Sequence, residues 1–265
     1  MIGTRRPDQV TRAEKEITIS PWENLSAKNL KLDLIIHLAG VYLTKYELES
    51  IHTSFETNVG LAASVASLQL ESKVPVVALG SFFERAPEEL QPWTYYASSK
   101  KASFELLKEA TQISKSKLIY LYIYDTYGSQ ISRGKFIDLL IDGINQRKEL
   151  DASEGQQKQD LTHIDDVAKA IIQASNLFEF IDHGTHEYQV RSRETLTLRE
   201  LAELANSEAK EPIAVNWGKY PYRGKEVFEI WDSANDLPNW KANRSLKGYF
   251  KSAFKENNLG EKIEN

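Results

Sequence analysis

Cysteine is absent from the 265 residues. Disulfide bonds, thiolate nucleophiles and sulfur-ligated metal sites are therefore excluded, while acid/base and cofactor-dependent chemistry stay open. Long apolar runs are absent as well: the longest, from Leu118 to Tyr124, has seven residues, whereas a membrane-spanning helix needs about 20. No apolar signal region follows Met1. We therefore expect a cytoplasmic protein without a membrane partner.

An excess of positive charge is missing too. The chain has 33 lysines and arginines against 38 aspartates and glutamates, a formal charge of -5, and no run of basic residues. This balance offers no electrostatic surface for DNA or RNA, so nucleic acid is not an expected partner. With 41% hydrophobic residues, the chain can bury a large core as one α/β domain or as a domain with a smaller appendage.

Closely spaced glycines are the third absence. No two of the 13 glycines are closer than six positions apart, so neither G-x-G-x-x-G nor a pair of glycines three apart occurs. The usual glycine-rich turn that places a dinucleotide pyrophosphate on a helix N-terminus is therefore not in this sequence.

Alternating strand and helix patterns are what the first half of the chain contains. Helical spacing of small and apolar residues covers Thr53–Lys73 and Thr94–Ser114. Short runs of β-branched and aromatic residues, typical of buried parallel strands, cover Asp33–Ala39, Val74–Gly80 and Lys117–Tyr124. This order predicts right-handed βαβ units and an α/β fold with a doubly wound, Rossmann-like parallel sheet.

The second half mixes further elements of this kind with irregular segments. We expect a truncated dinucleotide-binding core over residues 1–130, and core elements with a small C-terminal substrate lobe over residues 131–265. The patterns predict helices at Lys135–Asn145, from Asp165 and within TLTLRELAELANSEA, the last opened by a threonine cap, and a strand at His186–Val190. The segment after them is rich in proline, tryptophan and tyrosine, and should cover a pocket at the carboxyl edge of the sheet.

One tyrosine and one lysine stand a helical turn apart at the start of the second helix. Tyr96 and Lys100 would share a face of that helix, and a nearby ammonium favours phenolate, which would lower the pKa of Tyr96. The spacing alone is weak evidence, since about one such pair is expected by chance. Ser81, directly after the strand VPVVALG, supplies a hydroxyl at the carboxyl end of the sheet that can orient a carbonyl.

Several segments in the same order resemble the extended short-chain dehydrogenase/reductase family of NAD(P)-dependent epimerases, dehydratases and reductases of nucleotide sugars. They are DLIIHLAG, TNVGLAASV, GSFFE, YASSK, DTYG as the turn after a strand, and EGQQKQDLTHIDDVAKAI. YGSQISRGKF followed by EGQQKQDLTHIDD is most similar to the branch of CDP-abequose and CDP-paratose synthases, which are 4-ketoreductases.

The resemblance implies roles for individual residues. The catalytic group would be Ser81, Tyr96 and Lys100. The cofactor would contact Tyr96 and Lys100 together with Arg5, Arg6, Leu38, Ala39, Gly40 and Asn58. The nucleotide-sugar substrate would contact Ser81, Phe82, Asp125, Lys135, Phe136 and Asp160. Arg5 and Arg6 would meet a 2'-phosphate, which favours NADP, with NAD as the alternative; ordinary solvated charges are the other reading of this pair.

The implied function is NADPH-dependent reduction of a 4-keto sugar nucleotide, in the synthesis of O-antigen or another surface polysaccharide. A nucleotide-sugar 4-epimerase or dehydratase is one alternative, and a truncated, non-catalytic binding subunit is another. A homodimer is expected through the helices at 53–73 and 94–114.

The sequence also departs from the family pattern. Met1–Pro7 resembles the second strand of the family, so its first strand, glycine turn and first helix are not in this chain; a start-site error, a fragment and a real loss all stay open. This departure predicts weak cofactor binding and reduced stability. Many relatives have arginine where this chain has Gln159 and Tyr122, and asparagine where it has Asp125. These differences leave the identity of the substrate open.

Two histidine patterns have plainer interpretations. His37 lies in a strand expected to be buried, where a hydrogen-bonded core histidine is the simplest reading. His183 and His186 have no carboxylate at ligand spacing, so no metal site is expected there.

Overall fold

The computed structural model describes residues 2–4, 19–21, 31–43, 46–87, 92–128 and 134–260. Its fold is α/β with a parallel sheet, as the sequence predicts. The chain divides into two compact units. Unit 1 comprises residues 1–84, 90–121 and 175–187, and unit 2 comprises residues 85–89, 122–174 and 188–265.

The largest sheet has the strand order β12-β9-β5-β4-β3. Its strands are β3 (Ile35–His37), β4 (Val76–Ser81), β5 (Lys117–Ile123), β9 (Gly184–Val190) and β12 (Asn235–Asp236). β3 runs parallel to β4, with Ile35 opposite Val76. Apolar residues fill β4 and β5 almost continuously, and Val76, Val77 and Ile119 are completely buried. Such runs suit strands that are covered on both faces, and the three expected parallel strands are confirmed.

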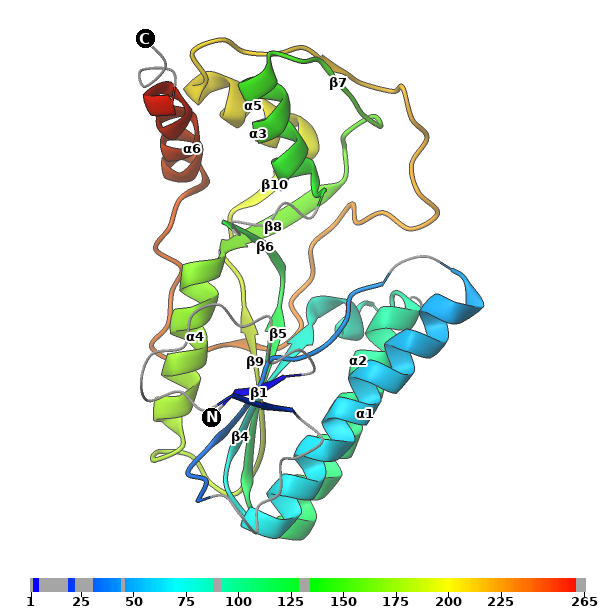
Figure 1. Ribbon diagram of the computed structural model, residues 1–265, viewed down its shortest axis with the longest axis vertical. Helices are drawn as coiled ribbons and strands as arrows, with labels where there is room; N and C mark the ends of the chain where they lie inside the picture. The colour runs from blue at the N-terminus through cyan, green and yellow to red at the C-terminus, as the bar shows by residue number, and fades with distance from the viewer. Residues whose placement is uncertain are drawn as a thin grey trace. The chain divides into compact units, whose positions relative to one another are not determined.

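Two long helices, α1 (Leu48–Ser72) and α2 (Tyr95–Ser114), lie side by side in unit 1 (Figure 1). Small residues, among them Ala62 and Ala66, are buried on α1 and allow close packing. α1 begins at Leu48 rather than at the expected Thr53, while the bounds of α2 match the prediction within one residue. The Thr94 side chain caps α2 by accepting a hydrogen bond from the Ala97 N–H at 3.2 Å.

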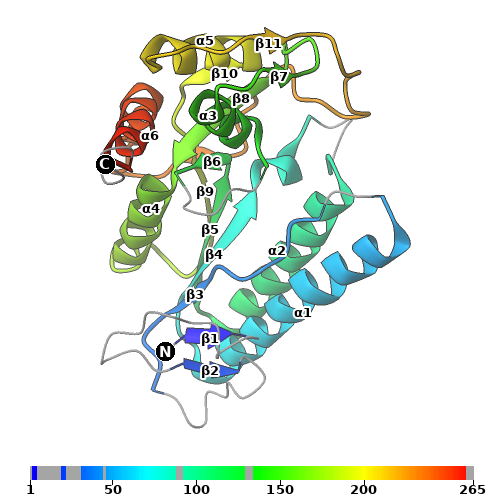
Figure 2. The same cartoon turned by 45° about the horizontal axis from the view of Figure 1, so that its top comes forward.

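A separate pair of parallel strands, β1 (Ile2–Thr4) and β2 (Ile19–Pro21), also belongs to unit 1 (Figure 2). β1 falls within the Met1–Pro7 segment that the sequence predicts to be a strand. Arg5 and Arg6 follow β1 directly and lie outside the described residues.

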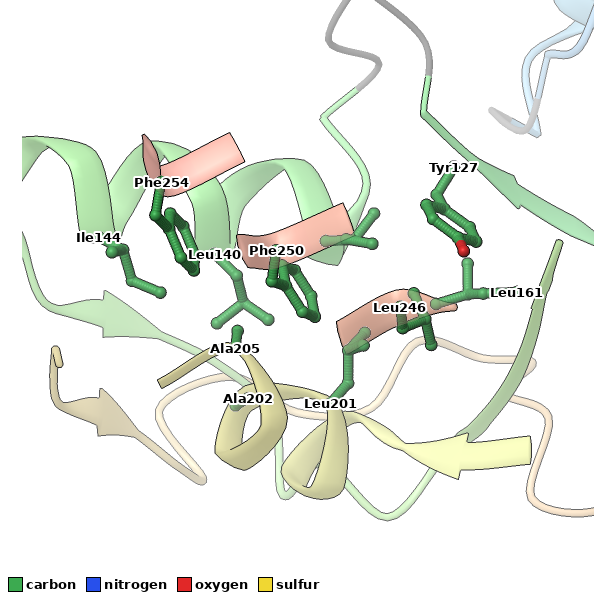
Figure 3. Close-up of a cluster of buried hydrophobic side chains, with 11 residues drawn as sticks. Tyr127, Leu140, Ile144, Leu161, Leu201, Ala202, Ala205, Leu246, Phe250 and Phe254 are labelled. Carbon is green, nitrogen blue, oxygen red and sulfur yellow. The ribbon is translucent and has the colours of Figure 1, made fainter. Parts of the chain in front are cut away.

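Unit 2 is built around the apolar cluster shown in Figure 3. The cluster is formed by residues of β6, β8, α3, α5 and α6, among them Tyr127, Leu161, Leu140, Leu201 and Phe250. The elements of this unit are β6 (Asp125–Tyr127), α3 (Phe136–Gln146), β7 (Leu150–Asp151), β8 (Lys158–His163), α4 (Ile164–Leu177, ending in unit 1), β10 (Thr195–Thr197), α5 (Leu198–Glu208), β11 (Val215–Asn216) and α6 (Leu246–Gly260).

Two parts of unit 2 differ from the sequence predictions. The DTYG segment, expected to be a turn, contains strand β6, because Asp125, Thr126 and Tyr127 pair in parallel with Leu161, Thr162 and His163 of β8. β8 itself begins at Lys158, in a segment for which the sequence analysis predicts no strand, and it forms the middle of the small sheet β10-β8-β6. Strand pairing on both edges thus overrides the polar local composition.

None of the described helices is long and apolar enough to cross a bilayer.

Candidate active site

Ser81 is the last residue of β4, at the carboxyl edge of the strand, where the sequence predicts it. A short 3-10 helix, η4 (Phe82–Arg85), follows at once. Ser81 is buried, and its Oγ accepts a hydrogen bond from the Phe83 N–H at 3.4 Å. The Phe82 ring, one of the expected substrate contacts, is also buried and packs on Phe83 with ring centroids 4.2 Å apart. A substrate contact through Phe82 stays a prediction.

Tyr96 and Lys100 lie in the first two turns of α2. Their spacing of one helical turn places both side chains on the same face of the helix. Lys100 is only 8% exposed, which is uncommon for a lysine. The ring of Tyr42, in the loop after β3, packs edge-on against the Tyr96 ring with centroids 4.8 Å apart. The pair is therefore held in a packed environment, in contrast to a freely solvated helix surface.

A buried carboxylate that the sequence analysis missed binds the Ser81 backbone and is linked through Tyr120 to the backbone of Lys100. Glu84 of η4 is 1% exposed, and its Oε1 accepts the Ser81 N–H at 2.6 Å. The Tyr120 hydroxyl of β5 lies 3.2 and 3.1 Å from the two carboxylate oxygens and 3.3 Å from the Lys100 carbonyl oxygen. The negative charge of Glu84 also acts on the side chains of both Tyr96 and Lys100. The one signal for this residue in the sequence was an acidic side chain three positions after Ser81.

The pKa of Tyr96 moves in the direction opposite to the sequence expectation. Burial raises the pKa of Tyr96 well above its usual range, and the charge of Glu84 and the neighbouring Tyr42 raise it further. Burial also lowers the pKa of Lys100, an effect that the carboxylate of Glu84 partly opposes. The expectation that Lys100 lowers the pKa of Tyr96 is therefore wrong for this chain, because desolvation of the phenolate and the negative charge of Glu84 dominate.

His37, on β3, is the core histidine that the sequence predicts. It is 6% exposed, and burial together with the charge of Lys100 lowers its pKa to about 4. It is therefore neutral near pH 7. The residues that the structure describes include no group of three potential metal-ligating side chains.

Asn58, on α1, fixes the loop after β3 by its whole side-chain amide. Its Oδ1 accepts the Val41 N–H at 2.8 Å, and its Nδ2 donates to the Val41 carbonyl oxygen at 3.1 Å and to Ser99 Oγ at 2.9 Å. Ser99 Oγ in turn donates to the Tyr96 carbonyl oxygen at 2.8 Å. Asn58 thus ties the loop to the turn of α2 that carries Tyr96. The three residues of this loop that are expected at the cofactor, Leu38, Ala39 and Gly40, are exposed.

The other expected substrate residues lie in unit 2. Lys135 Nζ is 4.0 Å from Asp125 Oδ1 and donates to the Thr126 carbonyl oxygen at 3.0 Å. Burial raises the pKa of Asp125, and this rise is opposed by Lys135 and reinforced by Asp160. The Phe136 ring lies 6.0 Å from the Trp217 ring. These contacts describe the surroundings of the predicted residues, and their role toward a substrate stays a prediction.

Asp160 is completely buried and strongly paired. Its carboxylate accepts hydrogen bonds from Arg191 Nε at 2.8 Å and from the N–H and Oγ of Ser192, each at 2.9 Å. Arg191 also contacts Asp232 at 2.9 Å and packs 4.9 Å from the centre of the Tyr124 ring. Asp160 therefore holds the segment after β9 in place, a contact that the sequence analysis did not anticipate.

A nicotinamide dinucleotide fits part of this residue set. A buried ammonium at Lys100 and the phenol of Tyr96, near an exposed loop at residues 38–40, are suitable donors for ribose hydroxyls. The pyrophosphate end is different, because the 13 glycines contain no pair closer than six positions apart and hence no glycine-rich turn. The fit therefore concerns the nicotinamide and ribose end.

Comparison with known proteins agrees with this geometry. Residues 4–190 match the NAD dependent epimerase/dehydratase family. The chain belongs to this family. CDP-abequose synthase of Salmonella muenchen is 23% identical over 235 residues, which cover 87% of this chain and 79% of that protein.

Solved structures of similar fold include two enzymes bound to a dinucleotide. UDP-glucuronic acid 4-epimerase from Bacillus cereus, in complex with UDP-glucuronic acid and NAD, has a TM-score of 0.76 at 16% identity and covers 91% of this chain and 80% of its own. RMD from Pseudomonas aeruginosa, complexed with NADPH, has a TM-score of 0.72 at 15% identity, with 95% and 93% covered. The chain is thus an enzyme of the NAD dependent epimerase/dehydratase family.

Proposed function

We propose that this family member reduces the C4 ketone of a nucleotide-activated deoxysugar, with NADP as its cofactor and NAD as the alternative. The observation that carries the proposal is the arrangement of Tyr96 and Lys100 on the first turns of α2, linked through the Glu84 carboxylate to the Ser81 strand end. A reduced nicotinamide supplies the hydride when it is bound.

The chain's own residues would divide the remaining work among them. Ser81 Oγ would hold the carbonyl oxygen of the substrate by a hydrogen bond. Tyr96 would donate its phenolic proton to that oxygen as negative charge develops there. Lys100 would bind the ribose hydroxyls with its ammonium group and stabilise the charge that Tyr96 acquires. Leu38, Ala39 and Gly40 would lie along the cofactor, in a loop held by Asn58.

The environment of Tyr96 suits the proton-donating role that we propose for it. Burial and the Glu84 charge raise the pKa of Tyr96. A phenol is the proton donor that reduction of a ketone requires, whereas epimerisation at C4 starts with removal of a hydroxyl proton by a base. The 4-epimerase and dehydratase alternatives therefore require an additional influence that lowers the pKa of Tyr96.

A CDP-activated sugar is the proposed substrate class, on the strength of the CDP-abequose synthase relative. The proposed substrate contacts are those that the resemblance implies: Ser81, Phe82, Asp125, Lys135, Phe136 and Asp160. For Asp160 the contact would be indirect, because its carboxylate is already bound to Arg191 and Ser192. Synthesis of O-antigen or another surface polysaccharide in the cytoplasm is the corresponding role.

The decisive experiment measures NADPH oxidation by the purified chain with a CDP-activated 4-keto deoxysugar. Tyr96→Phe should lower kcat roughly 100-fold or more, because general acid catalysis is lost while the ring stays in place. NADPH affinity should fall much less, because Lys100 still binds the ribose hydroxyls. Tyr95→Phe is the matched control: it removes the hydroxyl of the adjacent tyrosine, whose ring packs on Tyr46 at 5.2 Å. Equal turnover of wild type and Tyr96→Phe would remove Tyr96 from the mechanism.

The same preparation tests the non-catalytic alternative. A change in NADPH fluorescence on titration of the chain shows cofactor binding, and Lys100→Met should weaken that binding while Lys101→Met should not. An unchanged fluorescence at millimolar NADPH would favour a binding subunit over an enzyme.

A further inference from the structure

The residues around the Glu84 carboxylate leave just enough room for it. Gly80 directly precedes Ser81, and a Cβ at Gly80 would lie 2.2 Å from Tyr120 Cε1 and 2.8 Å from Glu84 Oε1. Such separations are far below van der Waals contact, so the absence of a side chain at position 80 is what lets Tyr120 and Glu84 meet. Phe104 of α2 closes the site from another side, with its ring 4.6 Å from the Tyr120 ring.

The hydrogen bonds of Glu84 connect two segments that carry predicted catalytic residues. One carboxylate oxygen accepts the Ser81 N–H at 2.6 Å, within the range of a strong charge-assisted bond. The Tyr120 hydroxyl has one proton, and it can donate that proton to the carboxylate or to the Lys100 carbonyl oxygen 3.3 Å away. The end of β4 and the second turn of α2 therefore share one buried polar network.

The charge of Glu84 is the second property of this site. A carboxylate that is 1% exposed acts through a poorly screened environment. The titratable groups that interact electrostatically with Lys100 or Tyr96 include His37 on β3, Tyr42 in the following loop and Glu84. His37 is neutral near pH 7, and Glu84 supplies a negative charge at this site.

We infer that Glu84 is a positioning residue of the reaction: its buried carboxylate fixes the Ser81 backbone, is joined through the Tyr120 hydroxyl to the turn of α2 that carries Lys100, and sets the electrostatic environment of Tyr96 and Lys100. This inference rests on the proposed function for its catalytic meaning. Removal of the negative charge makes loss of a proton easier for both neighbours, so Tyr96 and Lys100 should both deprotonate at lower pH. The reduction would then lose its proton donor and its cation as the pH rises.

Glu84→Gln separates the charge from the hydrogen bond. The glutamine Oε1 can still accept the Ser81 N–H, and its amide can donate to the Tyr120 oxygen, so the network survives while the charge disappears. Titration of lysine 13Cε signals by NMR, with the Lys100 signal assigned by its loss in Lys100→Met, reports the charge directly. The Lys100 signal should titrate lower in Glu84→Gln than in wild type by on the order of one pH unit.

Glu105→Gln is the control. It makes the same change of charge on α2, at an exposed side chain whose carboxylate lies 3.8 Å from Lys108 Nζ. The Lys100 signal should not move in this variant. A Lys100 titration that is the same in wild type and folded Glu84→Gln overturns the inference, because a purely structural glutamate predicts that result.

Kinetics give the second measurement. With a CDP-activated 4-keto deoxysugar, the alkaline fall of kcat should move to lower pH in Glu84→Gln by a similar amount, with KM changed less than about twofold. If wild type does not reduce such a sugar, the proposed function fails while the NMR titration still decides the role of Glu84. If wild type is active and neither titration nor pH profile moves, the positioning role is the part that fails.

Circular dichroism checks that the variant folds. Should Glu84→Gln not fold, Tyr120→Phe takes its place, since it keeps the carboxylate and removes a donor that holds it in position. The Lys100 signal is then expected to move in the same direction by a smaller amount. An unmoved signal in folded Tyr120→Phe would contradict the inference.

Discussion

Gly80 lies against the ring of Tyr120 and the carboxylate of Glu84. Any side chain at position 80 would collide with these two groups and disturb the packing next to Ser81. The sequence analysis identified Ser81, Tyr96 and Lys100 by motif and order, and the structure places each on the predicted element. The sequence did not reveal Glu84, because its importance depends on Tyr120, which is 36 residues away in the chain. The direction of the Tyr96 pKa was unpredictable for the same reason: burial is a property of the packed structure.

Gly80→Ala should destabilise the protein by about 1–3 kcal/mol, the usual cost of overpacking a filled core. The methyl group would meet the Tyr120 ring at 2.2 Å, and Tyr120 is itself 1% exposed and has little room to move. Gly60→Ala is the matched control, because a Cβ on Gly60 of α1 meets no atom within 4 Å, and alanine is the better helix former by about 1 kcal/mol. Urea denaturation measures both variants. Equal midpoints for Gly80→Ala and wild type would show that Tyr120 and Glu84 can shift without cost.

Elements with a strong apolar pattern were predictable, and elements that depend on distant partners were not. β4 and β5 are nearly continuous apolar runs. α5 begins with the expected threonine cap, in which Thr197 Oγ1 accepts a hydrogen bond from the Glu200 N–H at 3.1 Å. β8 contains charged and polar residues, and only pairing with β6 and β10 makes it a strand. α6 was also missed, although Leu246, Phe250 and Phe254 follow each other at intervals of one helical turn.

Phe250→Ala tests the contribution of α6 to unit 2. The Phe250 side chain is completely buried in the cluster of Figure 3, between α6 and residues of α3 and α5. Its removal should lower the free energy of unfolding by about 3–5 kcal/mol, through lost apolar burial and the cavity that remains. Lys251→Ala, at an exposed position of the same helix, should change the stability by less than about 0.5 kcal/mol. Similar urea midpoints for the two variants would indicate that α6 does not contribute to the core in solution.

At the scale of the whole molecule, the parallel sheet is expected from the sequence, but the division of the chain into two units is not. In the order β12-β9-β5-β4-β3, the neighbours β3, β4 and β5 are the three strands that alternate with helices in the first half of the sequence. Residues 175–187 belong with unit 1 although they follow much of unit 2 in the chain. Such a return depends on which surfaces pack together, and periodicity in a single sequence carries no information about it.

We propose that two copies of the chain form a homodimer through α1 and α2. α1 exposes Leu48, Phe55 and Leu70, whose sequence separations place them along one side of the helix, and their exposed fractions are 73%, 37% and 39%. Exposed apolar side chains on one side of a helix offer a surface on which another chain can pack. A second copy of the helix pair can pack there, because it presents the same exposed apolar side chains.

Leu70→Glu places a charge in the proposed interface and should convert the dimer into a monomer, because an unpaired carboxylate would be buried on association. Sedimentation velocity at micromolar concentration measures the change. Leu139→Glu is the matched control, since Leu139 is a leucine of similar exposure, 41%, on α3 in unit 2. A monomeric wild type would contradict the proposal outright. A dimer that persists in Leu70→Glu and dissociates in Leu139→Glu would move the interface to unit 2, where α3 would carry the contact instead of α1.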